Sequence, residues 1–380
     1  MRGAWPCFKV HPLKDRHGGR KTMQRKSRRA TLLALGVVST MALSLAASPA
    51  AAQTWTGGGP DNNWSTGANW SGAVAPASSP VTQLVFPSGA ARLTPVVDAP
   101  WTVNHLDFSI AGYSLSGQTL TFDGINPGIT ITGAFITIAN PIVLAAPFSV
   151  SGSSDFVTFN GPISGPGSLS SGGLGGTLLA GTHTFTGGVT VGSAHAFALA
   201  GSMPGPLVVT AGGSFSGSGT VTGAVTVSGS NAVLGLSAPL STGPLTVGAG
   251  SIVNLTISGN GPGQFGTVSV TGAVDITGAS LNLSGAYVPA PGDVFTFIVN
   301  DGTDPVIGTF AGLPEGATVT FNGAPLRISY VGGTGNDVTL SAPTSVAALP
   351  LPVPTLSEWA LILLALAVAG VGMARMRRGE

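Results

Sequence analysis

Apolar and polar residues alternate with a period of two through most of the chain. In the run 251–258, we expect Val253, Leu255 and Ile257 on one side of a strand and polar side chains on the other. Such runs are short, and glycine-rich segments such as residues 171–176 separate them. Between the two ends of the chain, no stretch of about eleven residues repeats its apolar positions with a helical period. The pattern predicts an all-β domain with many short strands joined by tight turns.

Short internal repeats indicate how these strands are arranged. Residues 131–135, 221–225 and 270–274 share the pattern Ile/Val-Thr-Gly-Ala-Phe/Val, and the distances between the copies are irregular. A β-solenoid tolerates loops of different length between its coils, whereas the blades of a propeller have a nearly constant length. We therefore expect residues 53–345 to form a β-solenoid, with a pair of β-sandwiches as the alternative.

Charged residues make up only 8% of the chain, and most of the positive ones lie near its two ends. Between Gln53 and Pro350 there are eleven acidic residues, two arginines (Arg92 and Arg327) and no lysine. This scarcity argues against binding to nucleic acid, which needs clustered positive charge. It fits a solenoid, because like charges stacked ~4.8 Å apart on successive coils repel one another. The single cysteine, Cys7, excludes a disulfide scaffold, and the many aliphatic residues argue against a disordered chain.

The N-terminal segment has the three parts of a secretory signal peptide. A basic stretch after Met23 is followed by an apolar run (residues 30–47) and by the small residues Ala50 and Ala52 of an A-x-A cleavage site. We expect residues 1–52 to be removed on export, with Met23 as an alternative start of translation. An uncleaved N-terminal anchor is the other interpretation.

The C-terminal segment contains a second apolar run, residues 359–374. As a helix it would be about 24 Å long, slightly less than the roughly 30 Å hydrocarbon core of a bilayer. Trp359 suits the headgroup region at one end, and Arg375, Arg377 and Arg378 suit the cytoplasmic face at the other. The run predicts a single transmembrane helix that leaves the main domain outside the inner membrane.

A proline-rich linker and a short motif precede this helix within residues 346–380. The motif residues are Val353, Pro354, Thr355, Leu356 and Trp359. With the helix and the basic tail they resemble the sorting signal of the IPTL-CTERM family of Gram-negative bacteria, although Val353 stands where Ile is usual and Ala360 where Gly commonly follows the Trp.

The resemblance implies an exosortase-like sorting enzyme in the membrane as a partner. Such an enzyme would cut near Pro354 and Thr355. The protein would pass from an inner-membrane intermediate to the cell surface, the outer envelope or the extracellular space. A plain single-pass tail anchor is the alternative.

Three other segments, residues 54–72, 185–191 and 329–340, carry short Gly-, Thr- and Asn-rich motifs. They resemble the passenger regions of autotransporter-associated β-strand-repeat proteins. This resemblance implies a right-handed parallel β-helix that is exposed at the cell surface.

A group of aromatic residues follows the predicted cleavage site. Trp55, Trp64 and Trp70 lie close together in sequence, beside several Asp and Asn residues, and could stack on sugar rings. Large aromatic residues also cap the open first coil of a solenoid, which must be covered to prevent edge pairing. We favour the cap and keep glycan contact as the alternative.

No pattern of metal-binding residues occurs in the sequence. Residues 332–337 match part of a calcium-binding nonapeptide, but that repeat binds calcium only in tandem, so a single copy predicts a turn. His105, His183 and His195 lack the spacing of metal ligands. We expect no metal and no cofactor.

Candidate catalytic carboxylates are few. Asp98 with Asp107, or Asp301 with Asp304, could be nominated as a pair for glycoside hydrolysis, but the second pair lies in a predicted turn. We therefore predict a structural or adhesin-like exported protein and no enzyme. A carbohydrate-binding module, or a β-helix enzyme acting on extracellular polysaccharide, is the alternative.

Overall fold

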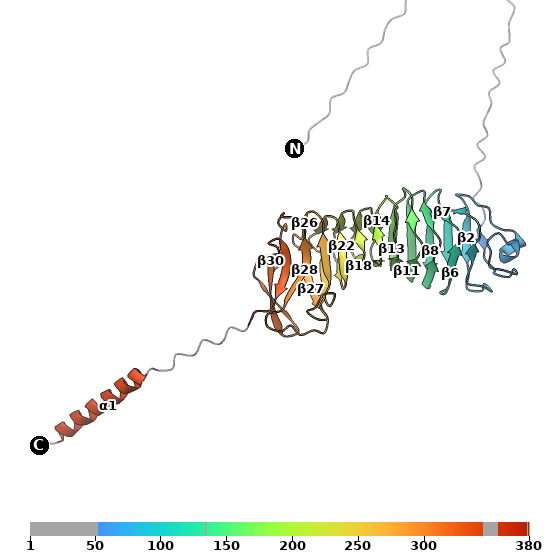
Figure 1. Ribbon diagram of the computed structural model, residues 1–380. Helices are drawn as coiled ribbons and strands as arrows, with labels where there is room; N and C mark the ends of the chain where they lie inside the picture. Colours follow the sequence, from blue (N-terminus) through green and yellow to red (C-terminus); the bar gives the residue numbers. More distant parts are fainter. Residues whose placement is uncertain (1–51, 134, 345–355, 378, 380) are drawn as a thin grey trace, which may run out of the picture. The chain divides into compact units, whose positions relative to one another are not determined.

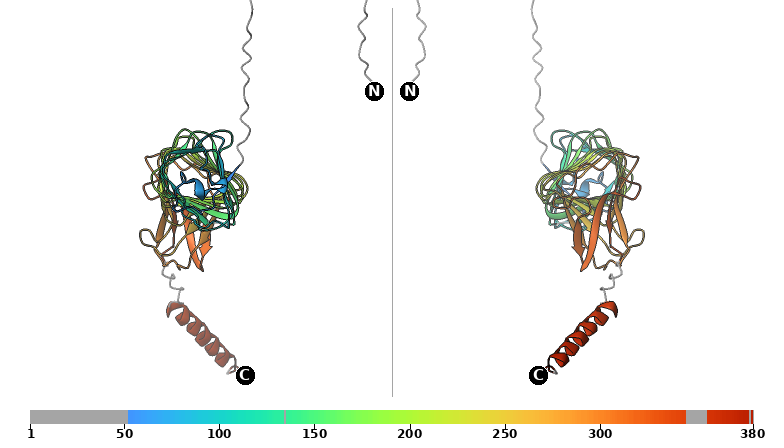
Figure 2. Two further views of the ribbon diagram at one scale, coloured as in Figure 1. Left: turned by 90° about the vertical axis from the view of Figure 1, so that its right-hand side faces the viewer. Right: turned by 90° about the vertical axis from the view of Figure 1, so that its left-hand side faces the viewer.

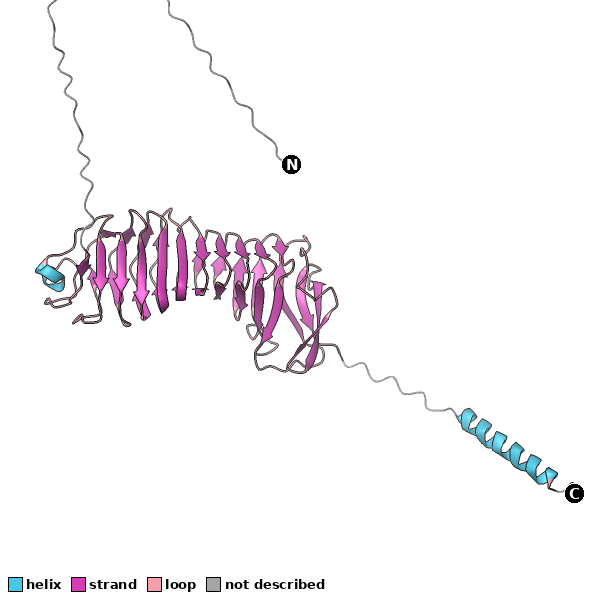
Figure 3. Ribbon diagram, turned by 180° about the vertical axis from the view of Figure 1, so that it is seen from behind, coloured by secondary structure: helices cyan, strands magenta, loops and turns pink. Residues whose placement is uncertain are grey.

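The computed structural model describes residues 52–133, 135–344, 356–377 and 379. Nearly all of this structure is β: the strands stack into a solenoid, and one apolar helix, α1 (Leu356–Met376), follows near the C-terminus (Figures 1 and 3). The predicted all-β solenoid is confirmed, and the sandwich alternative is wrong. The predicted signal peptide, with Ala50, lies outside the described residues.

Three stacks of parallel strands form the solenoid. The first stack contains β1 (Gln53–Thr54), β2 (Gln83–Phe86), β5 (His105–Phe108), β8 (Gly128–Thr132), the first part of β11 (Phe148–Phe159), the first part of β13 (Leu169–Leu179), β14 (Val189–Val191), β17 (Leu207–Val209), β20 (Val225–Val227), β23 (Leu245–Val247) and β26 (Val274–Asp275). The second contains β3 (Val96–Val97), β6 (Ser114–Gly117), β9 (Phe135–Ile138), the later parts of β11 and β13, β15 (His195–Leu199), β18 (Ser214–Gly217), β21 (Val233–Leu236), β24 (Ile252–Thr256) and β27 (Ser280–Ser284). β11 and β13 continue around a corner and so join these two stacks.

The third stack consists mostly of shorter strands. It runs through β4 (Trp101–Val103), β7 (Leu120–Phe122), β10 (Ile142–Leu144) and β12 (Ile163–Ser164), and then through β16 (Ser202–Met203), β19 (Thr220–Val221), β22 (Pro239–Thr242), β25 (Thr267–Val270) and β28 (Val294–Asn300). Beyond β28 the pairing becomes antiparallel through β31 (Asp337–Ser341), β30 (Ala324–Gly332) and β29 (Thr318–Phe321). In end-on views the coils superpose as a closed ring, and the strands of this last sheet extend beyond it (Figure 2).

The interior of the solenoid is built from columns of apolar side chains. Phe197 pairs with Phe215, 18 residues later, and Leu234 pairs with Val253, 19 residues later, so that each coil repeats the position of the previous one. All four side chains are buried. The predicted alternation in the run 251–258 is confirmed, since Val253, Leu255 and Ile257 are buried and Asn254 instead accepts a hydrogen bond from the Asn282 side chain at 3.0 Å on the next coil.

Glycine marks a corner where successive coils come into close contact. Gly181, Gly201 and Gly219, which we call the glycine ladder, lie between the second and third stacks. The backbone N–H of Ser202 donates to the Gly181 carbonyl at 2.8 Å, and that of Thr220 donates to the Gly201 carbonyl at 2.8 Å. A Cβ atom on Gly201 would lie 1.7 Å from the Gly181 carbonyl oxygen, so the corner leaves no room for a side chain.

Candidate functional site

The C-terminal helix is the first candidate. α1 runs from Leu356 to Met376 and is therefore longer at both ends than the predicted span. Its 21 residues correspond to about 31 Å, which matches the hydrocarbon thickness of a bilayer. The window Trp359–Met376 has a mean hydropathy of 1.9, and none of it is buried against the rest of the described chain.

The two ends of α1 carry different chemistry. Trp359 lies in the first turns and is 55% exposed, whereas Arg375 lies in the last turn and Arg377 follows it. A tryptophan at one end and arginines at the other are what a helix needs when its ends lie at the two headgroup regions. Leu356 is the first residue of the helix; Val353, Pro354, Thr355 and Arg378 lie outside the described residues.

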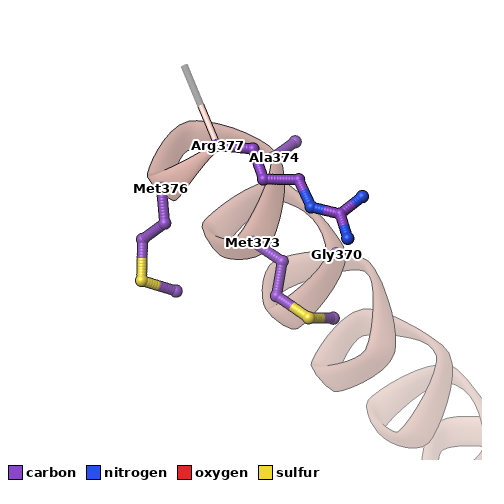
Figure 4. A pocket seen from close by; sticks show the side chains of 5 residues that line it. All are labelled: Gly370, Met373, Ala374, Met376 and Arg377. Atoms are coloured by element: carbon purple, nitrogen blue, oxygen red, sulfur yellow. The ribbon is translucent and has the colours of Figure 1, made fainter. Parts of the chain in front are cut away.

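The last turns of α1 present Gly370, Met373, Ala374, Met376 and Arg377 around a surface hollow (Figure 4). These residues belong to α1 or, for Arg377, directly follow it, and within the described part of the chain no second element forms an opposite wall. The hollow therefore lacks the enclosure that a small-molecule site has. Flexible methionine side chains beside an arginine suit the edge of a bilayer, where the arginine can extend its charge toward water.

The tryptophan group lies at the start of the solenoid. Trp55, Trp64 and Trp70 are 0%, 0% and 2% exposed. Trp70 packs edge-on against the other two, with ring centroids 5.1 and 5.7 Å apart, and all three contact Phe86. The Nε1 atom of Trp55 donates to the Arg92 carbonyl, and that of Trp70 donates to the Trp64 carbonyl, both at 2.8 Å.

The segment 53–79, which contains the tryptophan group, covers the edge of the first strand in each stack. β1 pairs with β2 in the first stack. In the second, the backbone N–H of Val96 donates to the Asn62 carbonyl at 2.7 Å. In the third, the backbone N–H of Ser79 donates to the Thr102 carbonyl at 2.9 Å. Covered edges cannot pair with another chain, so this segment forms a cap.

Burial of the three tryptophans bears directly on the glycan alternative. A sugar ring stacks only on an exposed aromatic face, and none of the three indoles has one. The burial favours the cap. We therefore do not propose a sugar site at Trp55, Trp64 and Trp70.

Two of the four nominated carboxylates, Asp98 and Asp301, hold turns and loops, whereas Asp107 lies in strand β5, 3.4 Å from Nε2 of His105. Asp98 accepts hydrogen bonds from the backbone and side chain of Ser65, and Asp301 accepts one from the backbone N–H of Gly272 at 2.7 Å. Asp337, in the predicted turn, accepts from the backbone N–H groups of Asn300 and Thr334 at 2.9 and 3.0 Å. Within the described ranges, no cluster of three or more His, Cys, Asp or Glu residues could hold a metal ion.

Two of the three histidines lie inside the solenoid. His183 and His195 are 2% and 3% exposed. Nδ1 of His183 accepts a hydrogen bond from the backbone N–H of Ile163 at 3.2 Å, and Nε2 of His195 lies 3.0 Å from the Thr177 hydroxyl. Burial lowers the pKa of His183 to about 4 and also lowers the pKa of His195. Both imidazoles are therefore neutral packing groups at neutral pH.

We expect acid to destabilise the solenoid through His183. Its pKa is about 4 in the folded chain and about 6.5 when unfolded, so the unfolded state takes up the proton first. The free energy of unfolding is then highest above pH 6.5 and falls as the pH drops toward 4, by about 3 kcal/mol for this group. Urea unfolding at pH 7 and pH 4.5 measures the loss. His183→Gln should show a smaller loss; an equal loss would contradict the assignment.

Comparison with known proteins bears on the C-terminal segment. The model of the IPTL-CTERM motif matches residues 352–378. No curated protein matches the chain. The predicted likeness to autotransporter-associated repeats receives no support from these comparisons and stays a prediction. The predicted sorting motif is confirmed: the chain ends in a sorting signal of the IPTL-CTERM type, consistent with an exported, membrane-anchored protein.

Proposed function

We propose that this chain is a structural or adhesin-like surface protein, delivered through its C-terminal sorting signal and without enzymatic activity. The observation that carries the proposal is the combination of a matched sorting motif at residues 352–378 with a fully exposed apolar helix of membrane-spanning length. An exosortase-like membrane enzyme recognises the motif, cuts next to it and transfers the solenoid to the outer envelope or beyond.

The solenoid itself supports a structural role. Its first coil is closed by the cap, its interior consists of columns of buried apolar residues, and the carboxylates of Asp98 and Asp301 hold loops in place. A long parallel β surface with few charged residues suits display at the cell surface.

A substitution in the motif tests the proposal. In a host with a sorting enzyme for such signals, Pro354→Ala should leave the unprocessed chain in the membrane fraction, because the enzyme reads the motif next to its cleavage site. The matched control is Pro350→Ala, a proline of the same linker that lies before the matched residues. Intact mass and cell fractionation report the result. Normal processing of the Pro354→Ala variant would refute recognition through this motif.

A further inference from the structure

Two aromatic rings lie side by side on the outer surface of the second stack. Phe135, on β9, is 68% exposed, and Phe156, on β11, is half-buried. Their ring centroids are 6.3 Å apart and their planes differ by 25°, so that the rings lie nearly parallel. Most large aromatic side chains of the solenoid point inward, which makes this exposed pair an exception.

A glycine on the next coil supports the second ring. A Cβ atom on Gly176 would lie 2.2 Å from Cε2 of Phe156, so the ring occupies the space that a side chain would otherwise take. Phe156 therefore lies over the backbone of Gly176, and its ring is partly exposed next to Phe135. We call Phe135 and Phe156 the aromatic platform.

A hydroxyl-lined hollow lies on the outer surface of the neighbouring first stack, on the other side of the corner that β11 makes. It has a volume of about 250 Å³ and spans β11, β13 and β14. Ser171 pairs with the buried Val150 and Val191 and faces the core, so the hydroxyl groups on the outer surface are those of Ser149, Ser151, Ser170 and Thr190. Among the described residues, no charged side chain lines the hollow; its walls are Ser149, Val150, Ser151, Ser170, Ser171, Gly172, Thr190 and Gly192.

One strand connects the hollow with the platform. β11 carries Ser149 and Ser151 in the hollow and Phe156 in the platform. Residues 151 and 156 are separated by at most about 17 Å along a strand. A flexible ligand that follows β11 around the corner between the two stacks can therefore contact both features.

We infer that the aromatic platform and the hollow together bind an uncharged polysaccharide. The apolar C–H face of a sugar ring covers an aromatic face, and its hydroxyl groups exchange hydrogen bonds with serine and threonine side chains. The excess of acidic residues over arginine between Gln53 and Pro350 repels an acidic polymer. This inference does not depend on the sorting signal.

The size of the platform argues for a sugar chain over a second copy of this protein. A phenylalanine offers at most roughly 150–250 Å². Two rings, one of them half-buried, remain well below the roughly 800 Å² per partner that a stable protein interface buries. A flexible polymer can use such a small site, because successive sugar units contact neighbouring features.

Binding of defined glycans tests the inference. The full chain, in a detergent without a sugar headgroup, is applied to immobilised neutral fragments of β-glucan, mannan and galactan, and to alginate as the acidic probe. We expect binding to at least one neutral fragment and none to alginate. The double variant Phe135→Ala, Phe156→Ala should weaken binding at least about tenfold, since an aromatic ring that a bound sugar covers raises the affinity by more than a factor of ten. The control Val331→Ala changes an exposed apolar residue on β30 and should bind like the wild type.

A second variant separates binding from folding. Phe135→Ala alone removes the more exposed ring, so it should reduce binding while the thermal midpoint changes little. Four results would overturn the inference: no neutral fragment binds, alginate binds more strongly, the double variant binds as well as the wild type, or the wild type self-associates through these rings in sedimentation experiments.

Discussion

Chains that carry both Leu364→Arg and Val368→Arg will be recovered in the soluble fraction, whereas the wild-type chain stays with the membrane in a host without a sorting enzyme. Between Trp359 and Met376, α1 contains seven Leu, Ile and Val residues. Each favours insertion by about 0.3–0.6 kcal/mol, and an arginine near the centre of the helix opposes it by about 2.5–3.5 kcal/mol. Two arginines therefore cost about 5–7 kcal/mol, more than the aliphatic residues provide together.

Extraction of membranes with alkaline carbonate measures this change. The matched control, Leu364→Ala with Val368→Ala, keeps the helix uncharged at the same two positions and should stay in the pellet. Both residues are exposed in the structure, at 60% and 63%, so neither substitution disturbs packing in the solenoid. If the arginine variant also resists extraction, α1 does not hold the protein in the bilayer.

The period-two alternation was sufficient to predict which residues face inward. In a strand, side chains alternate between two faces, so a run such as Ser251–Ser258 fixes its own buried side without reference to the rest of the chain. The sorting motif was equally accessible, because a linear signal is read from neighbouring residues. Both predictions depend on local sequence only.

The position that each repeat takes within its coil could not be predicted in the same way. The similar repeats 221–225 and 270–274 both lie at the corner from the third stack to the first, whereas 131–135 lies at the corner from the first to the second. The same short sequence thus serves two different turns. The number of residues in each coil decides which corner the sequence forms, and loops of different length change that number. The antiparallel sheet of β28, β31, β30 and β29 was not predicted either, because the direction in which strands pair depends on residues far apart in the sequence.

Neighbouring residues in the sequence do not predict the burial of the cap tryptophans, but they do predict the exposure of the aromatic platform. The tryptophans of the cap lie beside polar residues in sequence, and only the tertiary structure shows that they are buried. The aromatic platform could have been found from the sequence. In Phe135–Ile138 the buried positions are Ile136 and Ile138, and alternation then places Phe135 outside; the same holds for Phe156 before Val157.

Gly201→Ala will destabilise the solenoid more than any single methyl group added at its surface. The new Cβ atom would lie 1.7 Å from the carbonyl oxygen of Gly181 and 2.5 Å from two further backbone atoms of that residue. Backbone atoms of a neighbouring coil cannot rotate away as a side chain can. The ladder hydrogen bonds from Ser202 to Gly181 and from Thr220 to Gly201 would have to lengthen as the coils separate. We expect a loss of at least about 3 kcal/mol, at the upper end of overpacking effects.

The thermal midpoint of the full chain, followed by far-UV circular dichroism, should fall by at least about 5 °C for Gly201→Ala. Gly248→Ala is the matched control, because it adds the same methyl group to a coil where the nearest atom lies 3.9 Å away. That control should change the free energy of unfolding by less than about 1 kcal/mol, since the space is open and alanine restricts the unfolded chain. Equal midpoints for the two variants would mean that the coils can separate at this corner without cost, and the glycine ladder would then not be a structural requirement of the solenoid.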